Sequence, residues 1–150
     1  MPLRSPLRVL IVEDEALLAM QLEAMLADAG HEVVGWAMNS SEAMQLFQRA
    51  QPDLAFVDLQ LADGATGIEV ARQIRASDSS VVVFITANAK MLPEDFAGAV
   101  GVIRKPYSTQ GIEAALTYLY EGIRTPPPGG ALPRSLTLAP EYRARWKLIQ

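Results

Sequence analysis

The stretch LRVLIVEDEALL, residues 7–18, joins a run of apolar residues directly to a cluster of acids. Residues 9–12 are all branched aliphatic residues, which is typical of a strand buried on both faces of a sheet. Glu13, Asp14 and Glu15 follow at once. Because like charges repel and a buried charge is costly without a partner, this arrangement predicts a positive group at the end of the strand.

Short apolar runs alternate with amphipathic segments along the rest of the chain. The apolar runs predict strands over residues 8–12, 32–37, 54–58, 81–86 and 100–105. The amphipathic segments predict helices over residues 15–29, from Ser40 or Ser41 (as the cap) to before Pro52, and over 67–76, 91–97 (starting near Pro93) and 108–122 (capped by Ser108). Five strands alternating with five helices predict an α/β fold, a doubly wound, five-stranded parallel sheet.

Chemically active side chains stand where these predicted strands end. In a parallel sheet of this kind the ligand site lies beyond the carboxyl ends of the strands. Clustered carboxylates there favour a hard divalent cation such as Mg²⁺, while an ammonium and a hydroxyl can each hold a phosphoryl oxygen. A carboxylate in such surroundings is a competent nucleophile toward phosphorus. The candidate residues are Glu13, Asp14, Asp58, Thr86 and Lys105.

This set, in this order, resembles the response-regulator receiver domain of two-component signalling, of the chemotaxis CheY type, over residues 7–122. The resemblance implies a flavodoxin-like (βα)5 fold with strand order 2-1-3-4-5. It also implies a phosphorelay in which a histidine kinase or histidine phosphotransfer protein phosphorylates Asp58. Mg²⁺ would bind Asp14, Asp58 and the backbone carbonyl of Gln60, with Glu13 acting mainly through water. Such a protein is a phospho-acceptor with weak autodephosphorylation, not an enzyme.

The chain departs from the family pattern between Thr86 and Lys105. Val102 stands where most receivers carry an aromatic switch residue, and Lys105 follows Thr86 by only 19 positions. The loop after Asp58 also lacks the proline that many receivers have. A ring that turns inward at Val102 is therefore impossible, and we expect residues 88–98, with the strand edge near Tyr107, to form the signalling face.

Two other functions stay open. A phosphatase could use Asp58 as its nucleophile, but Gln60 stands where the dehalogenase-type phosphatases need a second aspartate, which argues against turnover. A pseudo-receiver could bind partners without phosphorylation, but the complete set of acids, Thr86 and Lys105 argues against that.

Composition narrows the range of partners. Net charge is −4, a fifth of the residues are charged and there is no cysteine, which excludes disulfides and thiolate metal sites. No basic block suggests nucleic acid, and no apolar run approaches the roughly 18 residues of a membrane span. We therefore expect a cytoplasmic protein with no nucleic-acid or membrane partner. His31 follows Gly30 in a predicted turn and is expected to be exposed to solvent.

The last part of the chain has a different composition. We expect a receiver domain over residues 1–123 and a Pro/Gly-rich linker with a short tail over 124–150, because PPPGG occupies residues 126–130. A short helix is predicted from Pro140, with Tyr142, Trp146 and Ile149 on one face. The tail could be disordered, or could dock on its own receiver, on a second copy or on a downstream protein target. It is too short for an output domain, so a stand-alone receiver is expected.

Overall fold

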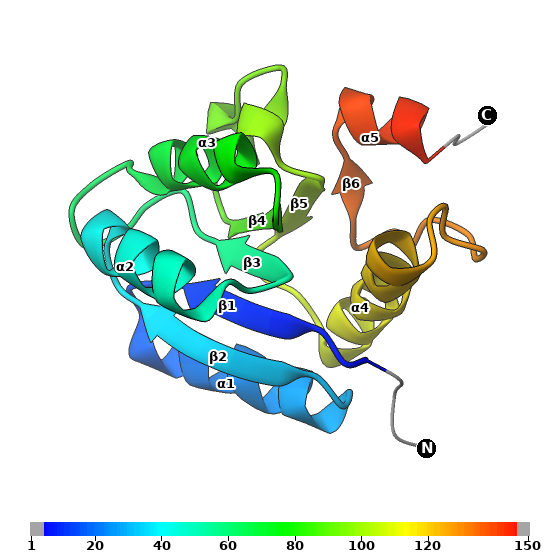
Figure 1. Ribbon diagram of the computed structural model, residues 1–150, viewed down its shortest axis with the longest axis horizontal. Helices are drawn as coiled ribbons and strands as arrows, with labels where there is room; N and C mark the ends of the chain where they lie inside the picture. Colours follow the sequence, from blue (N-terminus) through cyan, green and yellow to red (C-terminus); the bar gives the residue numbers. More distant parts are fainter. Residues whose placement is uncertain (1–4, 147–150) are drawn as a thin grey trace.

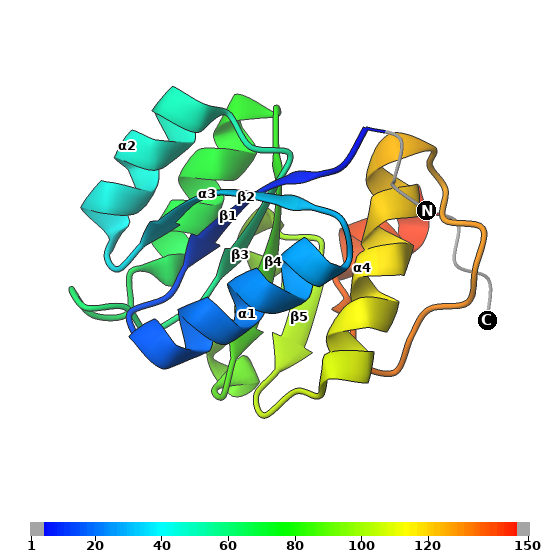
Figure 2. The same ribbon diagram turned by 90° about the horizontal axis from the view of Figure 1, so that it is seen from below.

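The computed structural model describes residues 5–146 and shows a six-stranded sheet with helices on both faces (Figures 1 and 2). The five predicted strands are parallel, in the order β2-β1-β3-β4-β5, which confirms the predicted α/β fold. A sixth strand, which was not predicted, pairs antiparallel with β5. The strands are β1 (Arg8–Val12), β2 (Glu32–Ala37), β3 (Leu54–Val57), β4 (Val81–Thr86), β5 (Gly101–Arg104) and β6 (Thr137–Leu138).

Four of the predicted helices form, together with the short helix near the end of the chain. They are α1 (Ala16–Asp28), α2 (Ser40–Ala50), α3 (Gly67–Ser77), α4 (Thr109–Arg124) and α5 (Pro140–Arg145). Ser108 caps α4 as predicted, since its Oγ accepts from the Gly111 N–H at 2.9 Å. The predicted cap of α2 is wrong: Asn39 is extended and accepts from the Glu42 N–H at 2.9 Å, which leaves Ser40 in the first turn.

The helix predicted over residues 91–97 does not form. Two 3₁₀ turns, η1 (Ala89–Met91) and η2 (Phe96–Gly98), connect β4 to β5 instead. Phe96, Ala97 and Gly98 have φ values of 53°, 52° and 83°, which no right-handed helix contains. A Cβ at Gly98 would lie 2.7 Å from Cγ of Arg75, so this connection runs tightly against α3.

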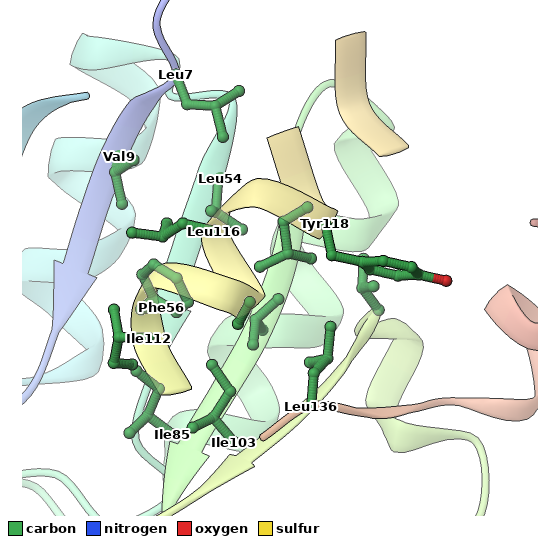
Figure 3. Close-up of a cluster of buried hydrophobic side chains, with 14 of the residues drawn as sticks. Leu7, Val9, Leu54, Phe56, Ile85, Ile103, Ile112, Leu116, Tyr118 and Leu136 are labelled. Carbon is green, nitrogen blue, oxygen red and sulfur yellow. The ribbon is translucent and has the colours of Figure 1, made fainter. Parts of the chain in front are cut away.

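Each face of the sheet carries its own apolar layer. Successive strand residues point to opposite faces, so Val9 and Phe56 join the layer under α1 and α4, while Leu10 and Val57 join the layer under α2 and α3 (Figure 2). Figure 3 shows part of the first layer, in which Leu136 packs with core residues of the strands and α4. Covering both faces explains why the strands read as unbroken apolar runs.

Residues 136–146, called the C-terminal segment below, complete the sheet and the first apolar layer. β6 lies along the outer edge of β5, and α5 follows it directly (Figure 1). Tyr142 and Trp146 are both buried, on the face predicted for them, whereas Ile149 lies outside the described residues. The segment therefore docks on its own chain. Within residues 5–146, no helix has both the length and the apolarity needed to cross a bilayer.

His31 is buried, so the prediction that it is exposed is wrong. Only 7% of its surface is exposed, and its Nδ1 accepts a hydrogen bond from the Leu7 N–H at 3.1 Å. Its ring lies 5.7 Å from that of Tyr120. Burial lowers the pKa of His31, and the positive charge of Arg124 lowers it further. The imidazole is therefore neutral in the fold, with its proton on Nε2.

This geometry predicts a pH dependence of stability. In the unfolded chain His31 has a pKa of about 6.5, and in the folded chain its pKa is lower. The contribution of neutral His31 to stability is therefore fully present above a pH of about 6.5 and is lost as the pH falls below it. We expect the free energy of unfolding, measured in urea, to fall more steeply between pH 7.5 and 5.5 in the natural chain than in His31→Gln. That variant keeps an acceptor near Leu7 but cannot titrate. Equal slopes in the two proteins would contradict the prediction.

Candidate functional site

Three acids meet at the carboxyl ends of β1 and β3. Glu13 and Asp14 follow β1, and Asp58 follows β3. Two backbone bonds of 2.9 Å extend the parallel ladders past the strand ends, from Glu13 N–H to Ala37 and from Asp58 N–H to Val12. One carboxylate oxygen from each acid lies within 4.8 Å of the others. The ladders thus hold the acids side by side.

The predicted positive partner is Lys105, which follows β5. Its Nζ donates to Oε1 of Glu13 and to Oδ2 of Asp58, both at 2.7 Å. The three side chains are largely buried, with exposed fractions of 14% for Lys105, 8% for Glu13 and 10% for Asp58. An ammonium between two carboxylates offsets their repulsion, which makes their burial tolerable.

Burial and hydrogen bonding shift the pKa values of Lys105 and Glu13 in opposite directions. Burial alone would lower the pKa of Lys105, but its hydrogen bonds to Asp58 and Glu13 outweigh that effect and raise the pKa. Burial raises the pKa of Glu13, and the bonds from Lys105 and from the Glu15 N–H only partly oppose it. Lys105 therefore keeps its positive charge, and Glu13 takes up a proton more readily than an exposed glutamate.

Thr86 and Gln60 lie at the same rim. Thr86 is the last residue of β4 and is buried, and its Oγ1 accepts from the Asn88 N–H at 3.1 Å. The Gln60 N–H points at Oδ1 of Asp58, at 3.3 Å. The structure thus brings every residue of the candidate set to one end of the sheet: Glu13, Asp14, Asp58, Gln60, Thr86 and Lys105.

Two supporting residues escaped the sequence reasoning. Trp36, at the end of β2, donates from Nε1 to the Glu13 carbonyl at 2.6 Å and so fixes the backbone of the acidic pair. Gly67, the first residue of α3, has no room for a side chain because a Cβ there would overlap the Asp58 carbonyl oxygen. The role of Trp36 could have been inferred from the sequence, because a tryptophan near the end of a predicted strand can reach the acids at the end of a neighbouring one. The contact of Gly67 could not, because it depends on how α3 returns to the sheet.

Val102 and Tyr107 show where the chain has an aromatic ring near the site and where it has none. Val102 is buried, and it pairs with Phe84 of β4 on one side and with Thr137 of β6 on the other. Tyr107 is partly buried beside the site and lines a small hollow with Glu13 and Asp58. Burial raises the pKa of Tyr107, so its phenol is neutral at ordinary pH.

The donor set fits a hard divalent cation. Glu13, Asp14 and Asp58 offer only carboxylate oxygens, and Asp14 is half-buried, so one side of the cluster faces solvent. Mg²⁺ takes oxygen ligands and keeps several waters, which such an open cluster allows. Within residues 5–146 this is the one group of acids or histidines that meets the geometry of a metal site.

Comparisons with known proteins agree with this geometry. A family model described as the response regulator receiver domain matches residues 9–117. The chain is 30% identical over 113 residues to the chemotaxis protein CheY of Thermotoga maritima, which covers 73% of this chain and 93% of that protein. It is 33% identical over 111 residues to the phyllosphere-induced regulator PhyR of Methylorubrum extorquens, covering 73% of this chain but only 42% of PhyR.

A solved structure agrees as well. The receiver domain of PhyR from Erythrobacter litoralis, determined by NMR in solution, is similar to this chain with a TM-score of 0.72 and 29% identity. The alignment covers 85% of this chain and 97% of that structure.

The shared ammonium leads to a stability prediction. Lys105→Met leaves Glu13 and Asp58 buried without a cation, so we expect the free energy of unfolding to fall by about 3–5 kcal/mol. Added Mg²⁺ should stabilise this variant more than the natural chain, because the metal would then be the remaining positive charge. Urea unfolding with and without Mg²⁺ measures both effects.

The matched control is Lys90→Met, which removes an exposed lysine near the same rim. It should change stability by less than about 0.5 kcal/mol. An equal loss in the two variants, or equal stabilisation by Mg²⁺ in Lys105→Met and the natural chain, would refute the structural role given to Lys105.

Proposed function

The chain belongs to the response-regulator receiver family, and from that premise we propose that Asp58 accepts a phosphoryl group from the phosphohistidine of a kinase or a histidine phosphotransfer protein. Receiver domains are signalling modules. The observation that carries the proposal is the position of Lys105, whose Nζ lies 2.7 Å from both Asp58 and Glu13 at the open rim. A buried ammonium at that point is suited to hold a phosphoryl oxygen.

The transfer is a displacement at phosphorus. A carboxylate oxygen of Asp58 forms a bond to the phosphorus while the bond from phosphorus to the donor imidazole breaks, and that electron pair stays on the imidazole nitrogen. Lys105 follows the phosphoryl group, because the new oxygens carry more negative charge than the carboxylate did. The hydroxyl of Thr86 would donate its proton to another phosphoryl oxygen, which it can do while its Oγ1 accepts from the Asn88 N–H.

We propose that the acidic cluster binds Mg²⁺ during the transfer. Asp14, Asp58 and the backbone carbonyl of Gln60 would hold it directly, and Glu13 through water. Bound there, the ion would neutralise negative charge on the phosphoryl oxygens. The residues of the chain orient the acceptor: the Gln60 N–H positions Oδ1 of Asp58, and Trp36 holds the backbone of Glu13.

Signalling then proceeds by protein contact. The chain spans less than half the length of PhyR, so nothing of that protein's further partners transfers with the alignment. We propose a downstream protein target or a second copy as the receiver of the signal, reached through the connection between β4 and β5. Residues 88–98 are suited to change because they hold two 3₁₀ turns where an α-helix was predicted.

The acceptor assignment is tested by intact mass. After treatment with acetyl phosphate and Mg²⁺, the natural chain should gain one phosphate, because Asp58 pairs with Lys105 and lies in the acidic cluster beside the half-buried Asp14. Asp58→Asn should gain none, and omission of Mg²⁺ should reduce the gain at least tenfold. Asp63→Asn is the control, since Asp63 is an exposed aspartate held by Ser40 and Thr66 in the loop after Asp58. Equal labelling of Asp58→Asn would sink the assignment.

The lifetime of the phosphate follows from the side chains beside its path. Gln60 and Asn88 are exposed neutral amides that can orient a water but are poor at taking its proton. We expect the phosphorylated chain, freed of donor at neutral pH, to lose its phosphate over minutes or longer. Timed intact-mass measurements report the decay, and loss within a few seconds would show that a better base lies near the site.

A further inference from the structure

The C-terminal segment packs on β5 and α4 at two positions where only glycine leaves enough space. A Cβ at Gly101 of β5 would overlap the carbonyl oxygen of Thr137, and a Cβ at Gly122 of α4 would overlap the ring of Trp146. Both glycines have φ values outside the positive range, so neither is required by backbone conformation. The absence of a side chain at these two positions allows the segment to pack closely on β5 and α4.

Specific contacts hold the segment on this surface. The Ala139 N–H donates to the Val100 carbonyl at 2.7 Å, and Nη1 of Arg104 donates to Oγ1 of Thr137 at 3.1 Å. Trp146 packs edge-on against Tyr118 of α4, with ring centres 5.7 Å apart. Leu136 (Figure 3) and Leu138 are both buried in the apolar layer under α1 and α4. The segment therefore acts as a ligand of the β5 edge within its own chain.

Two routes connect this docked segment to the candidate phosphorylation site. The first is β5 itself, whose outer edge pairs with β6 and whose next residue is Lys105. The second runs through α3. Arg75 bonds Glu141 of α5 at 2.6 Å and also packs against Gly98, at the end of the connection that begins at Thr86.

Few backbone pairs hold the C-terminal segment in the sheet. β6 contributes two residue pairs to the sheet, fewer than any other strand. Residues 125–131, which lead to it, are mostly exposed and contain no helix or strand. Elements with few pairs and an exposed connection open at lower free energy than the core of a fold.

We propose that the C-terminal segment is a releasable cover of the β5 edge, and that phosphorylation of Asp58 releases it. This regulation rests on the proposed function of Asp58. The released edge is a surface for strand pairing, and the segment shows the occupant it accepts: two buried leucines that flank a threonine, followed by aromatic residues.

Release, rather than tighter docking, follows from charge. Phosphorylation replaces the single charge of the Asp58 carboxylate with about two negative charges on phosphoryl oxygens near Lys105, the residue after β5. These attract Lys105 and also the guanidinium of Arg104, which now bonds the neutral hydroxyl of Thr137. Movement of the β5 end toward the phosphoryl group strains a pairing of only two residues. Coupling of this kind is reciprocal, so loosening the segment must favour the phosphorylated state equally.

Hydrogen exchange tests the release. Peptides covering residues 136–146 are followed by mass spectrometry in the whole chain with Mg²⁺, with and without beryllofluoride, an aspartyl-phosphate mimic. We expect amides of the segment to exchange at least fivefold faster with the mimic, while those of β1 change less than twofold. Fluorine NMR of bound beryllofluoride reports occupancy of Asp58 independently.

Gly122→Ala tests reciprocity. It displaces the Trp146 ring while substituting a better helix former within α4. We expect fast exchange of the segment without the mimic, and at least threefold tighter binding of beryllofluoride. Trp146→Ala should do the same by removing the ring itself. Gly129→Ala is the control and should behave as the natural chain, because a Cβ there meets nothing closer than Glu121 Oε1 at 3.8 Å.

The outcomes separate the two proposals. Full occupancy by fluorine NMR with exchange of the segment unchanged or slower overturns the release and leaves the function of Asp58 intact. Unchanged mimic affinity in both Gly122→Ala and Trp146→Ala, when their segments exchange fast, also overturns the coupling. No bound beryllofluoride in the natural chain overturns the function of Asp58 and the release together.

Discussion

The ammonium of Lys105, shared between Glu13 and Asp58, is the constraint on which the rest of the structure depends. It joins the ends of β1, β3 and β5, which are not neighbours in sequence. Two carboxylates can be buried at this rim because one cation faces both of them. The arrangement requires parallel strands that end level with one another, and hence apolar helices on both faces to cover the sheet.

The same constraint makes β5 the strand that connects the candidate site to the C-terminal segment. Its inner edge pairs with β4, its end carries Lys105, and its outer edge pairs with β6. An uncovered edge strand is a template for pairing with other chains, and natural proteins protect such edges. Here the cover is part of the chain itself and is held by a short ladder, so protection and release depend on the same few contacts.

The connection between β4 and β5 departs from the predicted alternation of strands and helices. Positive φ values at Phe96, Ala97 and Gly98 replace a helix by turns that pack on α3. Arg72 and Arg75 of α3 then reach outward, the first to Asp95 of the connection and the second to Glu141 of α5. The family model matches residues 9–117, so the C-terminal segment lies outside the matched region.

The features that the sequence by itself determined are those that local patterns encode. The five parallel strands were readable because burial on both faces makes each one an apolar run, and the acids, Thr86 and Lys105 were readable because each one stands at or just past the end of its strand. The gathering of these residues at one rim followed from the parallel direction of the strands.

Tertiary structure alone decided the rest. His31 is buried because its Nδ1 meets the N–H of Leu7, 24 residues away, which a turn composition could not reveal. Asn39 caps α2 because the chain is extended there, which frees Ser40 to bond Asp63 across the rim. The partners of Gly101 and Gly122 lie in the C-terminal segment, and so does the pairing of β6. These contacts join residues far apart in the chain, so their free energy exists only once the sheet has formed, and no local period in the sequence records it.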